Sequence, residues 1–302
     1  MAQCAIAAPD TFPPLAPRDR HAFLELWNHH YELLRGEAQD NLRQLALGVD
    51  IAPFVLRQLH GWSMRHRLIA ATTLGHLRTR AAAPELERLS RHPSAALSFA
   101  AARALMEIKP SDHLPPLLLL IAQRHDWPLS RIALALRDLG ADRFSAALAD
   151  AALEASRDPA TVSGLPRLVH LMELAHTTHV MPTVYHLLRR GQTLGPEIIA
   201  PCLRLLNDPR QAPLARAFAT HDTWYVRVVA ANALRRIGDI EDYVRLMRMV
   251  SDRYWWVRYR AAQALATLPS VTCDELLAVA KVHHDKFAAD MLRHVAAEAS
   301  LL

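Results

Sequence analysis

The chain repeats one pattern of apolar positions at intervals of 31 residues. Each copy has two adjacent small or branched apolar residues and a leucine three places after the second of them. The copies fall at Ala70, Ala71 and Leu74; Ala101, Ala102 and Leu105; Ile132, Ala133 and Leu136; Ala230, Ala231 and Leu234; and Ala261, Ala262 and Leu265. Between the third and fourth copies the pattern blurs through a proline-rich stretch. A fixed period near 30 residues predicts a repeat architecture.

The apolar positions within a copy have helical spacing. Val226, Ala230, Leu234 and Ile237 are 4, 4 and 3 residues apart and form one stripe of a helix. A pair of short helices cannot bury such a stripe alone, whereas stacking on the next pair completes the burial. Glycine is scarce, at nine residues, which also favours helix over loop-rich folds. The sequence therefore predicts an all-α solenoid built from stacked helix pairs.

The residues before the repeats predict a helical cap. Helices are expected over about 19–35, 37–47 and 52–59, the first carrying Phe23, Trp27, Tyr31 and Leu34 at helical spacing. The predicted organisation is an irregular segment over 1–18, a helical cap over 19–61 and a repeat solenoid over 62–302. A last amphipathic helix from about 285 to 299 closes the far end.

Two segments near the C-terminus share a longer motif. They read HDTWYVRVVAANALRRIG and SDRYWWVRYRAAQALATLP, and MRHRLIAATTLGHL follows the same plan earlier in the chain. This motif resembles the bacterial HEAT repeats of the PBS-lyase HEAT-like type. The resemblance implies a right-handed α-solenoid (an ARM-like superhelix) whose second helices line a concave face. It also implies that a repeat arginine, matched by Arg67, Arg227 and Arg258, braces the turn acid of a neighbouring repeat; Asp252 keeps this acid and His221 replaces it.

The last two repeats carry the candidate binding residues. Exposed Trp, Tyr and Arg dominate protein-binding hot spots, and adjacent aromatic residues cannot share one face of a helix. The candidates are Trp224, Tyr225, Arg227, Asn232, Arg235, Trp255, Trp256, Arg258, Tyr259 and Gln263, and Tyr254 belongs to the same cluster of aromatic residues and arginines. The alternative is structural: Trp224 and Trp255 fill gaps between repeats, and the arginines brace loops.

The solenoid prediction also orders residues across the two repeats. Val228, Asn232 and Arg235 are expected to lie beside Tyr259, Gln263 and Ala266 respectively. This ladder would face the concave groove, and its mixture of polar, aromatic and cationic groups suits a protein or polyanion partner.

Charge adds a weaker alternative. The chain has a net charge of +5 and a pI near 9.4, and only three of its 35 basic residues are lysine. Some HEAT-like proteins are DNA glycosylases that use Trp, Tyr, Arg and one Asp, and Asp126–Trp127 or Asp222 with Trp224 and Tyr225 could take such roles. A nucleic-acid-binding or DNA-repair function is therefore the alternative to a protein-binding scaffold.

Catalytic and metal motifs are missing from the sequence. It has no GxSxG, Walker or GxGxxG motif, no HExxH, and no His followed by Glu, which di-iron HEAT hydroxylases require. Two groups of residues contain enough nearby histidines to be considered as metal ligands: His170, His176 and His179, and His283 and His284 with Asp285. Their spacing is not that of a zinc site. We expect no catalytic residue, metal or cofactor, and hence no enzyme.

The remaining features bear on location and partner. Cys4, Cys202 and Cys273 form no disulfide framework, and we find neither a signal peptide nor a transmembrane segment. We expect a cytoplasmic scaffold for another protein. Similar bacterial proteins are often encoded beside glycosyltransferases for surface polysaccharide, which favours a membrane-associated enzyme complex, reached from the inner face of the membrane through a partner or an upstream anchor.

Overall fold

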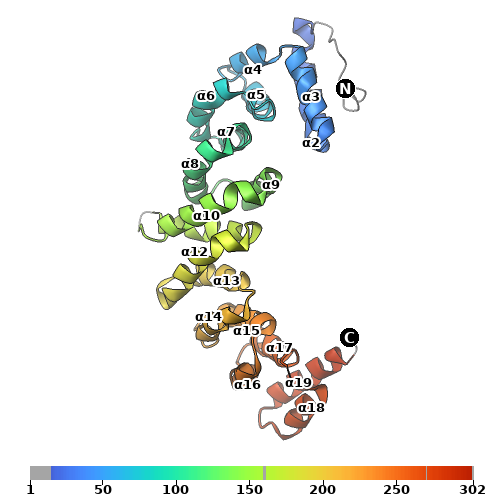
Figure 1. The fold of residues 1–302 in the computed structure, drawn as a ribbon, viewed down its shortest axis with the longest axis vertical. Helices are drawn as coiled ribbons and strands as arrows, with labels where there is room; N and C mark the ends of the chain where they lie inside the picture. The colour runs from blue at the N-terminus through green and yellow to red at the C-terminus, as the bar shows by residue number, and fades with distance from the viewer. Residues whose placement is uncertain (1–14, 159–160, 270, 301–302) are drawn as a thin grey trace. The chain divides into compact units, whose positions relative to one another are not determined.

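The computed structural model describes residues 15–158, 161–269 and 271–300, and within these ranges it contains helices and no strand (Figure 1). The all-α prediction is confirmed. Short 3₁₀ turns connect several helices, at Pro17–Asp19, Arg80–Ala82, Val162–Gly164, Met172–Leu174, Gly191–Thr193, Pro209–Gln211 and Ile240–Asp242.

The chain forms two compact units, Met1–Ala151 and Ala152–Leu302, and the boundary falls inside helix α10. The helices up to this boundary are α2 (Arg20–Leu33), α3 (Glu37–Gly48), α4 (Ala52–Gln58), α5 (Met64–His76), α6 (Ala83–Ser90), α7 (Ala95–Ile108), α8 (Pro110–Gln123), α9 (Leu129–Leu139) and α10 (Ala141–Ala155). Those of the C-terminal unit are α11 (Leu165–Leu171), α12 (Thr177–Arg189), α13 (Pro196–Arg204), α14 (Ala212–Ala217), α15 (Trp224–Ile237), α16 (Tyr243–Val250), α17 (Trp255–Leu265), α18 (Cys273–Val282) and α19 (Lys286–Ala299).

The repeated apolar stripe lies in the core of both units. In α5, α7, α15 and α17 the repeated alanines and leucines are at most 1% exposed. Helices α5 and α7 pack on each other in the N-terminal unit, as α15 and α17 do in the C-terminal unit (Figure 1). Small residues permit a close approach: a Cβ on Gly75 of α5 would lie 2.7 Å from the Ala104 Cα of α7. The helix-pair stacking predicted from the 31-residue period is therefore present.

The turn between repeats uses a hydrogen-bond acceptor at one fixed position. His92, His221, Asp252 and His283 occupy equivalent places, and each accepts a hydrogen bond from the backbone N–H two residues later, at 2.9–3.1 Å. An imidazole Nδ1 can therefore replace the carboxylate oxygen in this turn. This explains three of the histidines as structural residues.

The expected arginine brace is also present. Arg227 donates to both carboxylate oxygens of Asp252, at 2.7 and 2.9 Å, and to the carbonyl of His221 at 2.7 Å. Arg258 donates in the same way to the carbonyl of Asp252, whereas Arg67 reaches the carbonyl of Leu59. The arginine thus joins one turn to the next in the C-terminal unit.

One repeat lacks this arginine, and an arginine of the following segment makes the corresponding contact. Ser98 stands where Arg227 stands in its repeat, and Arg124 enters from the following segment. Its guanidinium donates to the carbonyl of His92 at 3.0 Å, to Ser98 Oγ at 2.8 Å, and to both oxygens of Asp126 at 2.7 Å. The carbonyl of His92, which corresponds to that of His221, therefore accepts a hydrogen bond from Arg124, a residue that the repeat alignment does not predict.

The N-terminal helices follow the predicted ranges closely. Trp27 and Tyr31 of α2 are buried, and Trp27 Nε1 donates to the carbonyl of Leu42 at 2.7 Å, which fixes α2 against α3. Residues 1–14 of the predicted irregular segment lie outside the described residues. The three-part division at 18 and 61 stays a prediction.

Candidate protein-binding surface

Exposed aromatic side chains gather at the start of helices α15 and α17. Trp224, Tyr254, Trp255 and Trp256 are 36%, 38%, 46% and 51% exposed. Trp224 stacks on Tyr254 with ring centroids 5.7 Å apart, and the rings of Trp255 and Trp256 meet edge to face at 4.7 Å. These residues come together because α15 and α17 pack on each other and each helix begins with a pair of aromatic residues.

The adjacent tryptophans line different hollows, as expected for neighbours on a helix. Trp256 lines a hollow of about 520 Å³ with Trp224, Tyr225 and Asn232, and residues of α13 form its other wall. Trp255 lines a second hollow of about 290 Å³ with Arg258 and with Phe287, Asp290, Met291 and His294 of α19. Both hollows lie within the C-terminal unit.

Several of the candidate residues have structural partners. Arg227 is 7% exposed and is held by Asp252, so its guanidinium is part of the repeat packing and not of the open surface. Tyr259 donates to Glu298 of α19 at 3.2 Å, and burial, followed by this carboxylate, raises the pKa of its phenol. The Gln263 side chain accepts from Arg260 at 2.8 Å.

Arg258 has an intermediate position. One of its terminal nitrogens donates to the carbonyl of Asp252, and its guanidinium carbon lies 5.4 Å from the centre of the Phe287 ring. Its Nε is buried and, among the residues that the structure describes, has no hydrogen-bond partner. Arg258 therefore both braces the turn and forms part of the wall of the smaller hollow.

The polar ladder stays a prediction, although α15 and α17 do pack on each other. Arg235 is exposed, and its carbonyl accepts a hydrogen bond from Thr267 Oγ1 at 3.4 Å. Asn232 is half-buried and lines the larger hollow.

The proposed glycosylase role of Trp127 is wrong, whereas that of Asp222 with Trp224 and Tyr225 stays a prediction. Trp127 is 0% exposed and its indole N–H donates to Ser98 at 3.0 Å. Asp126 forms an ion pair with Arg124. Trp127 therefore cannot stack on a base, whereas Asp126, with 43% of its side chain exposed, is a partner of Arg124 at the surface.

The histidine groups also have structural contacts. His283 accepts a hydrogen bond from the Asp285 N–H, and Asp285 caps α19 by accepting from the Phe287 N–H at 2.9 Å. The rings of His176 and His179 lie 6.4 Å apart. In the described part of the chain, no three His, Cys, Asp or Glu side chains gather in a way that could hold a metal ion.

Sequence reasoning missed one large exposed residue of this surface. Phe287 is 69% exposed at the start of α19 and borders Trp255. It also missed Trp62, which is fully exposed in the N-terminal unit. Phe287 lies beyond the last clear copy of the motif, but it follows the helix cap Asp285, which places it in the exposed first turn.

Chemically, the surface offers large apolar faces rimmed by arginine. Such a composition suits protein recognition, because aromatic rings provide buried area and guanidinium groups pair with carboxylates. No helix in the described ranges is long and apolar enough to cross a membrane.

The comparison with known proteins agrees with this architecture. A family model described as HEAT repeats matches residues 52–137 and 194–266, which is more than half of the chain. No curated protein matches the sequence. HEAT repeats commonly serve as protein-interaction scaffolds and are typically non-catalytic. With a repeated buried stripe, arginine-braced turns and this match, the chain belongs to the HEAT-repeat family.

Proposed function

We propose that this protein is a non-catalytic scaffold that binds a partner protein through the aromatic surface of its C-terminal unit. The surface consists of Trp224, Tyr254, Trp255, Trp256 and Phe287. The observation that carries the proposal is the exposure of these five large aromatic side chains, from 36% to 69%, at the starts of α15, α17 and α19.

Exposure of this kind is costly for a protein without a partner. Burying an aromatic side chain in an interface stabilises the complex by roughly 1.5–3 kcal/mol relative to leaving the ring in water. A purely structural role for the tryptophans, as fillers of gaps between repeats, explains only part of this exposure. Trp224 is partly covered by Tyr254, whereas half of Trp256 is exposed. The aromatic surface therefore has the composition of a binding hot spot.

The partner surface is expected to carry carboxylates. Arg235 and Arg253 are exposed near the aromatic surface, and Arg260 lines the larger hollow. Guanidinium groups pair with carboxylates in bidentate fashion, which adds specificity to an apolar contact. An acidic segment with one or two apolar side chains would complement both hollows. A link to a membrane-associated enzyme complex is a further part of this proposal.

Affinity capture with paired variants tests the function. The tagged wild-type chain is compared with the Trp255→Ala/Trp256→Ala variant and with Trp62→Ala, which removes a fully exposed tryptophan from the other unit. Proteins retained by the wild type and by Trp62→Ala, but lost from the double variant, are the expected result. Equal recovery on all three baits contradicts the proposal, provided that circular dichroism shows unchanged helix content.

Nucleic acid is the alternative partner, because Arg-rich surfaces and exposed aromatic rings also suit single strands and duplexes. Titration of fluorescent DNA at increasing salt separates the two. A scaffold for proteins gives no binding at 50 mM salt, whereas a nucleic-acid protein binds and loses affinity steeply as salt rises.

A further inference from the structure

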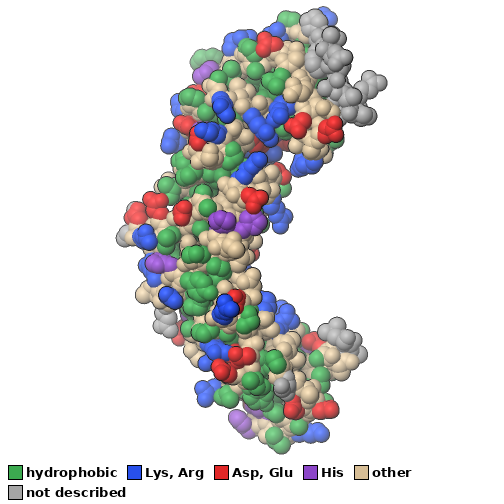
Figure 2. Space-filling model, in the orientation of Figure 1, with side chains coloured by type: hydrophobic (Ala, Val, Ile, Leu, Met, Phe, Trp, Pro, Cys, Tyr) green, Lys and Arg blue, Asp and Glu red, His purple; other side chains and the backbone are tan. Residues whose placement is uncertain are grey.

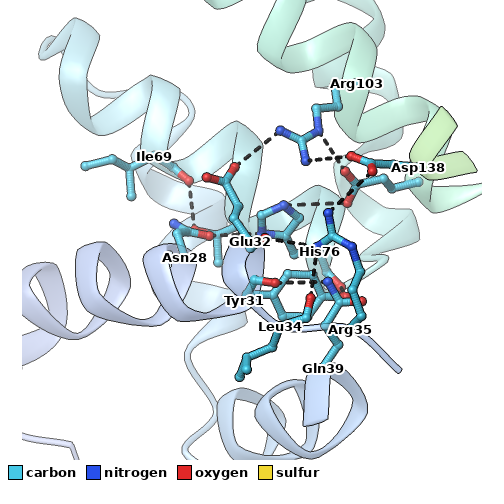
Figure 3. Close-up of polar contacts among 12 residues, drawn as sticks. Asn28, Tyr31, Glu32, Leu34, Arg35, Gln39, Ile69, His76, Arg103 and Asp138 are labelled. Carbon is cyan, nitrogen blue, oxygen red and sulfur yellow. Dashed lines mark hydrogen bonds and ion pairs between the residues drawn. The ribbon is translucent and has the colours of Figure 1, made fainter. Parts of the chain in front are cut away.

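The N-terminal unit contains a polar pocket that the sequence pattern did not indicate. It has a volume of about 370 Å³ and is lined by residues of α2, α3, α5, α7, α9 and α10 and of the segments that follow α2 and α5. Figure 3 shows polar contacts of several of these residues. Five arginines and three acidic residues line it: Arg35, Arg78, Arg103, Arg137 and Arg143, with Glu32, Glu107 and Asp138. On the face shown in Figure 2, Lys and Arg side chains gather over this unit.

Part of this charge is paired internally. Arg103 donates to Glu32 and Glu107, each at 3.2 Å, and lies 3.8 Å from Asp138. Arg35 reaches the same Asp138 at 3.4 Å, so Asp138 lies between the two guanidinium groups (Figure 3). The three carboxylates are thus shared by two of the five arginines.

The other three arginines lie outside these ion pairs, although Arg78 is close enough to Glu107 to lower the pKa of its carboxyl. Within the described residues, no side-chain hydrogen bond or ion pair joins Arg78, Arg137 or Arg143 to another group. With its Arg, Glu and Asp side chains ionised and His76 and Tyr31 neutral, the pocket has two more positive than negative charges. Unpaired guanidinium groups around a concave site attract an anion, because each offers a planar, bidentate donor.

Arg78 also occupies a strained backbone position. Its φ is +55°, and it forms the left-handed residue that ends α5, with the Thr79 N–H donating to the Leu74 carbonyl at 3.0 Å. Glycine is the usual residue in this motif because it lacks a Cβ. An arginine held there at a cost of roughly 1–2 kcal/mol is the kind of strain found at binding sites.

We propose that this pocket binds a small dianionic oxyanion, a phosphate or sulfate group or a dicarboxylate, through Arg78, Arg137 and Arg143. The charge excess of two matches a dianion, and the volume admits a molecule larger than inorganic phosphate. Tyr31 and His76 close the inner wall: His76 is 2% exposed, and the hydrogen bond from its Nδ1 to Asn28 Oδ1 (3.2 Å) fixes the ring.

Glu107 couples the binding to pH. Burial raises the pKa of its carboxyl to about 7, against the opposing effect of Arg103. The groups around it are Arg103 on α7, His76 and Arg78 at the end of α5, Tyr31 on α2 and Asp138 on α9. A bound dianion repels ionised Glu107, so affinity is higher when this carboxyl is protonated and falls as pH rises through 7.

Isothermal titration calorimetry of the full chain with sulfate tests the proposal, since sulfate stays dianionic between pH 6 and 8.5. We expect saturable binding that weakens by about tenfold over this range, and pH-independent binding to Glu107→Gln. Phosphate and succinate titrations distinguish a tetrahedral from a dicarboxylate ligand. Absence of saturable binding of all three probes at pH 6 overturns the proposal.

Matched variants locate the site. Arg137→Ala should weaken binding by at least about tenfold, the usual effect of removing a charge-assisted hydrogen bond. Arg57→Ala removes an exposed arginine of α4 that does not line the pocket and should leave the affinity unchanged. Equal weakening in both variants would mean non-specific charge attraction and would overturn the assignment.

A glycine variant separates binding from folding. Arg78→Gly should weaken sulfate binding like Arg137→Ala and at the same time raise the thermal unfolding midpoint, since glycine relieves the left-handed strain. A variant that binds sulfate as the wild type does contradicts the role of Arg78, whatever its stability.

Discussion

At the scale of single residues, arginine has two different roles in this molecule. Arg227 is a structural residue: it is 9% exposed along its side chain and bonded to a carboxylate that is 13% exposed. Arg137 and Arg143 are exposed and line a polar pocket. The motif predicts the first role because the turn acid and the arginine recur with the repeat. It cannot predict the second, because the pocket combines residues of several helices, from Tyr31 to Arg143, that do not recur with the repeat.

Removing the buried brace should be costly. Arg227→Ala leaves Asp252 ionised without its partner, and the loss of one member of a buried ion pair destabilises a protein by about 3–5 kcal/mol. Urea unfolding followed by circular dichroism measures the change. Arg88→Ala, which breaks an exposed pair with Glu85, is the control and should leave the unfolding midpoint unchanged. Equal small effects in both variants would show that the brace contributes nothing.

Glu107 and His76 predict an unusual dependence of stability on pH. Burial lowers the pKa of His76 to about 3 and raises that of Glu107 to about 7. The folded state therefore binds the Glu107 proton more tightly than the unfolded state, and stability contributed by this carboxyl falls as pH rises from about 4.5 to 7. His76 acts in the opposite direction between about 3 and 6.5, so the two effects oppose each other.

Glu107→Gln isolates one of these effects. Its free energy of unfolding, relative to the wild type, should rise by about 1.4 kcal/mol per pH unit between pH 4.5 and 7, to a total of at most about 3 kcal/mol. Parallel urea titrations at several pH values measure this difference. A constant difference across the range would mean that Glu107 ionises normally in the folded protein.

At the scale of elements, the spacing of helices depends on small residues. Gly75 lies inside α5, where a Cβ would meet the Ala104 Cα at 2.7 Å and the Ala104 Cβ at 2.9 Å. The period of the sequence predicts that α5 and α7 are neighbours, since both carry the alanine pair. It does not show that Gly75 lies at their closest approach, because the other copies have no glycine at the position after the repeated leucine.

Gly75→Ala separates helix propensity from packing. Propensity alone predicts stabilisation by roughly 1 kcal/mol, since alanine is the better helix former. The close approach predicts destabilisation by about 1–3 kcal/mol, because α7 must move away. Thermal unfolding of the variant decides between the two signs. A higher midpoint would mean that the helices separate without cost and that the tight contact has no role.

At the scale of the whole molecule, the helix class and the repeat pairing follow from the sequence, because a period of 31 residues repeats both the buried stripe and the turn chemistry. The C-terminal surface was only partly predicted. The motif indicates Trp224, Trp255 and Trp256, but the exposure of each ring depends on neighbouring helices: Tyr254 partly covers Trp224, and α19 adds Phe287. Trp127 illustrates the opposite case, since a residue that suits base stacking is fully buried.

Hydroxyl-radical footprinting of the captured complex tests the central claim, that the partner docks on the aromatic surface of the C-terminal unit. In the free protein, the exposed residues Trp62, Trp255 and Trp256 should be oxidised, while the buried Trp27 and Trp127 are protected. Partner binding should protect Trp255 and Trp256 and leave Trp62 as reactive as before. Unchanged oxidation of Trp255 and Trp256 in the complex would contradict the claim.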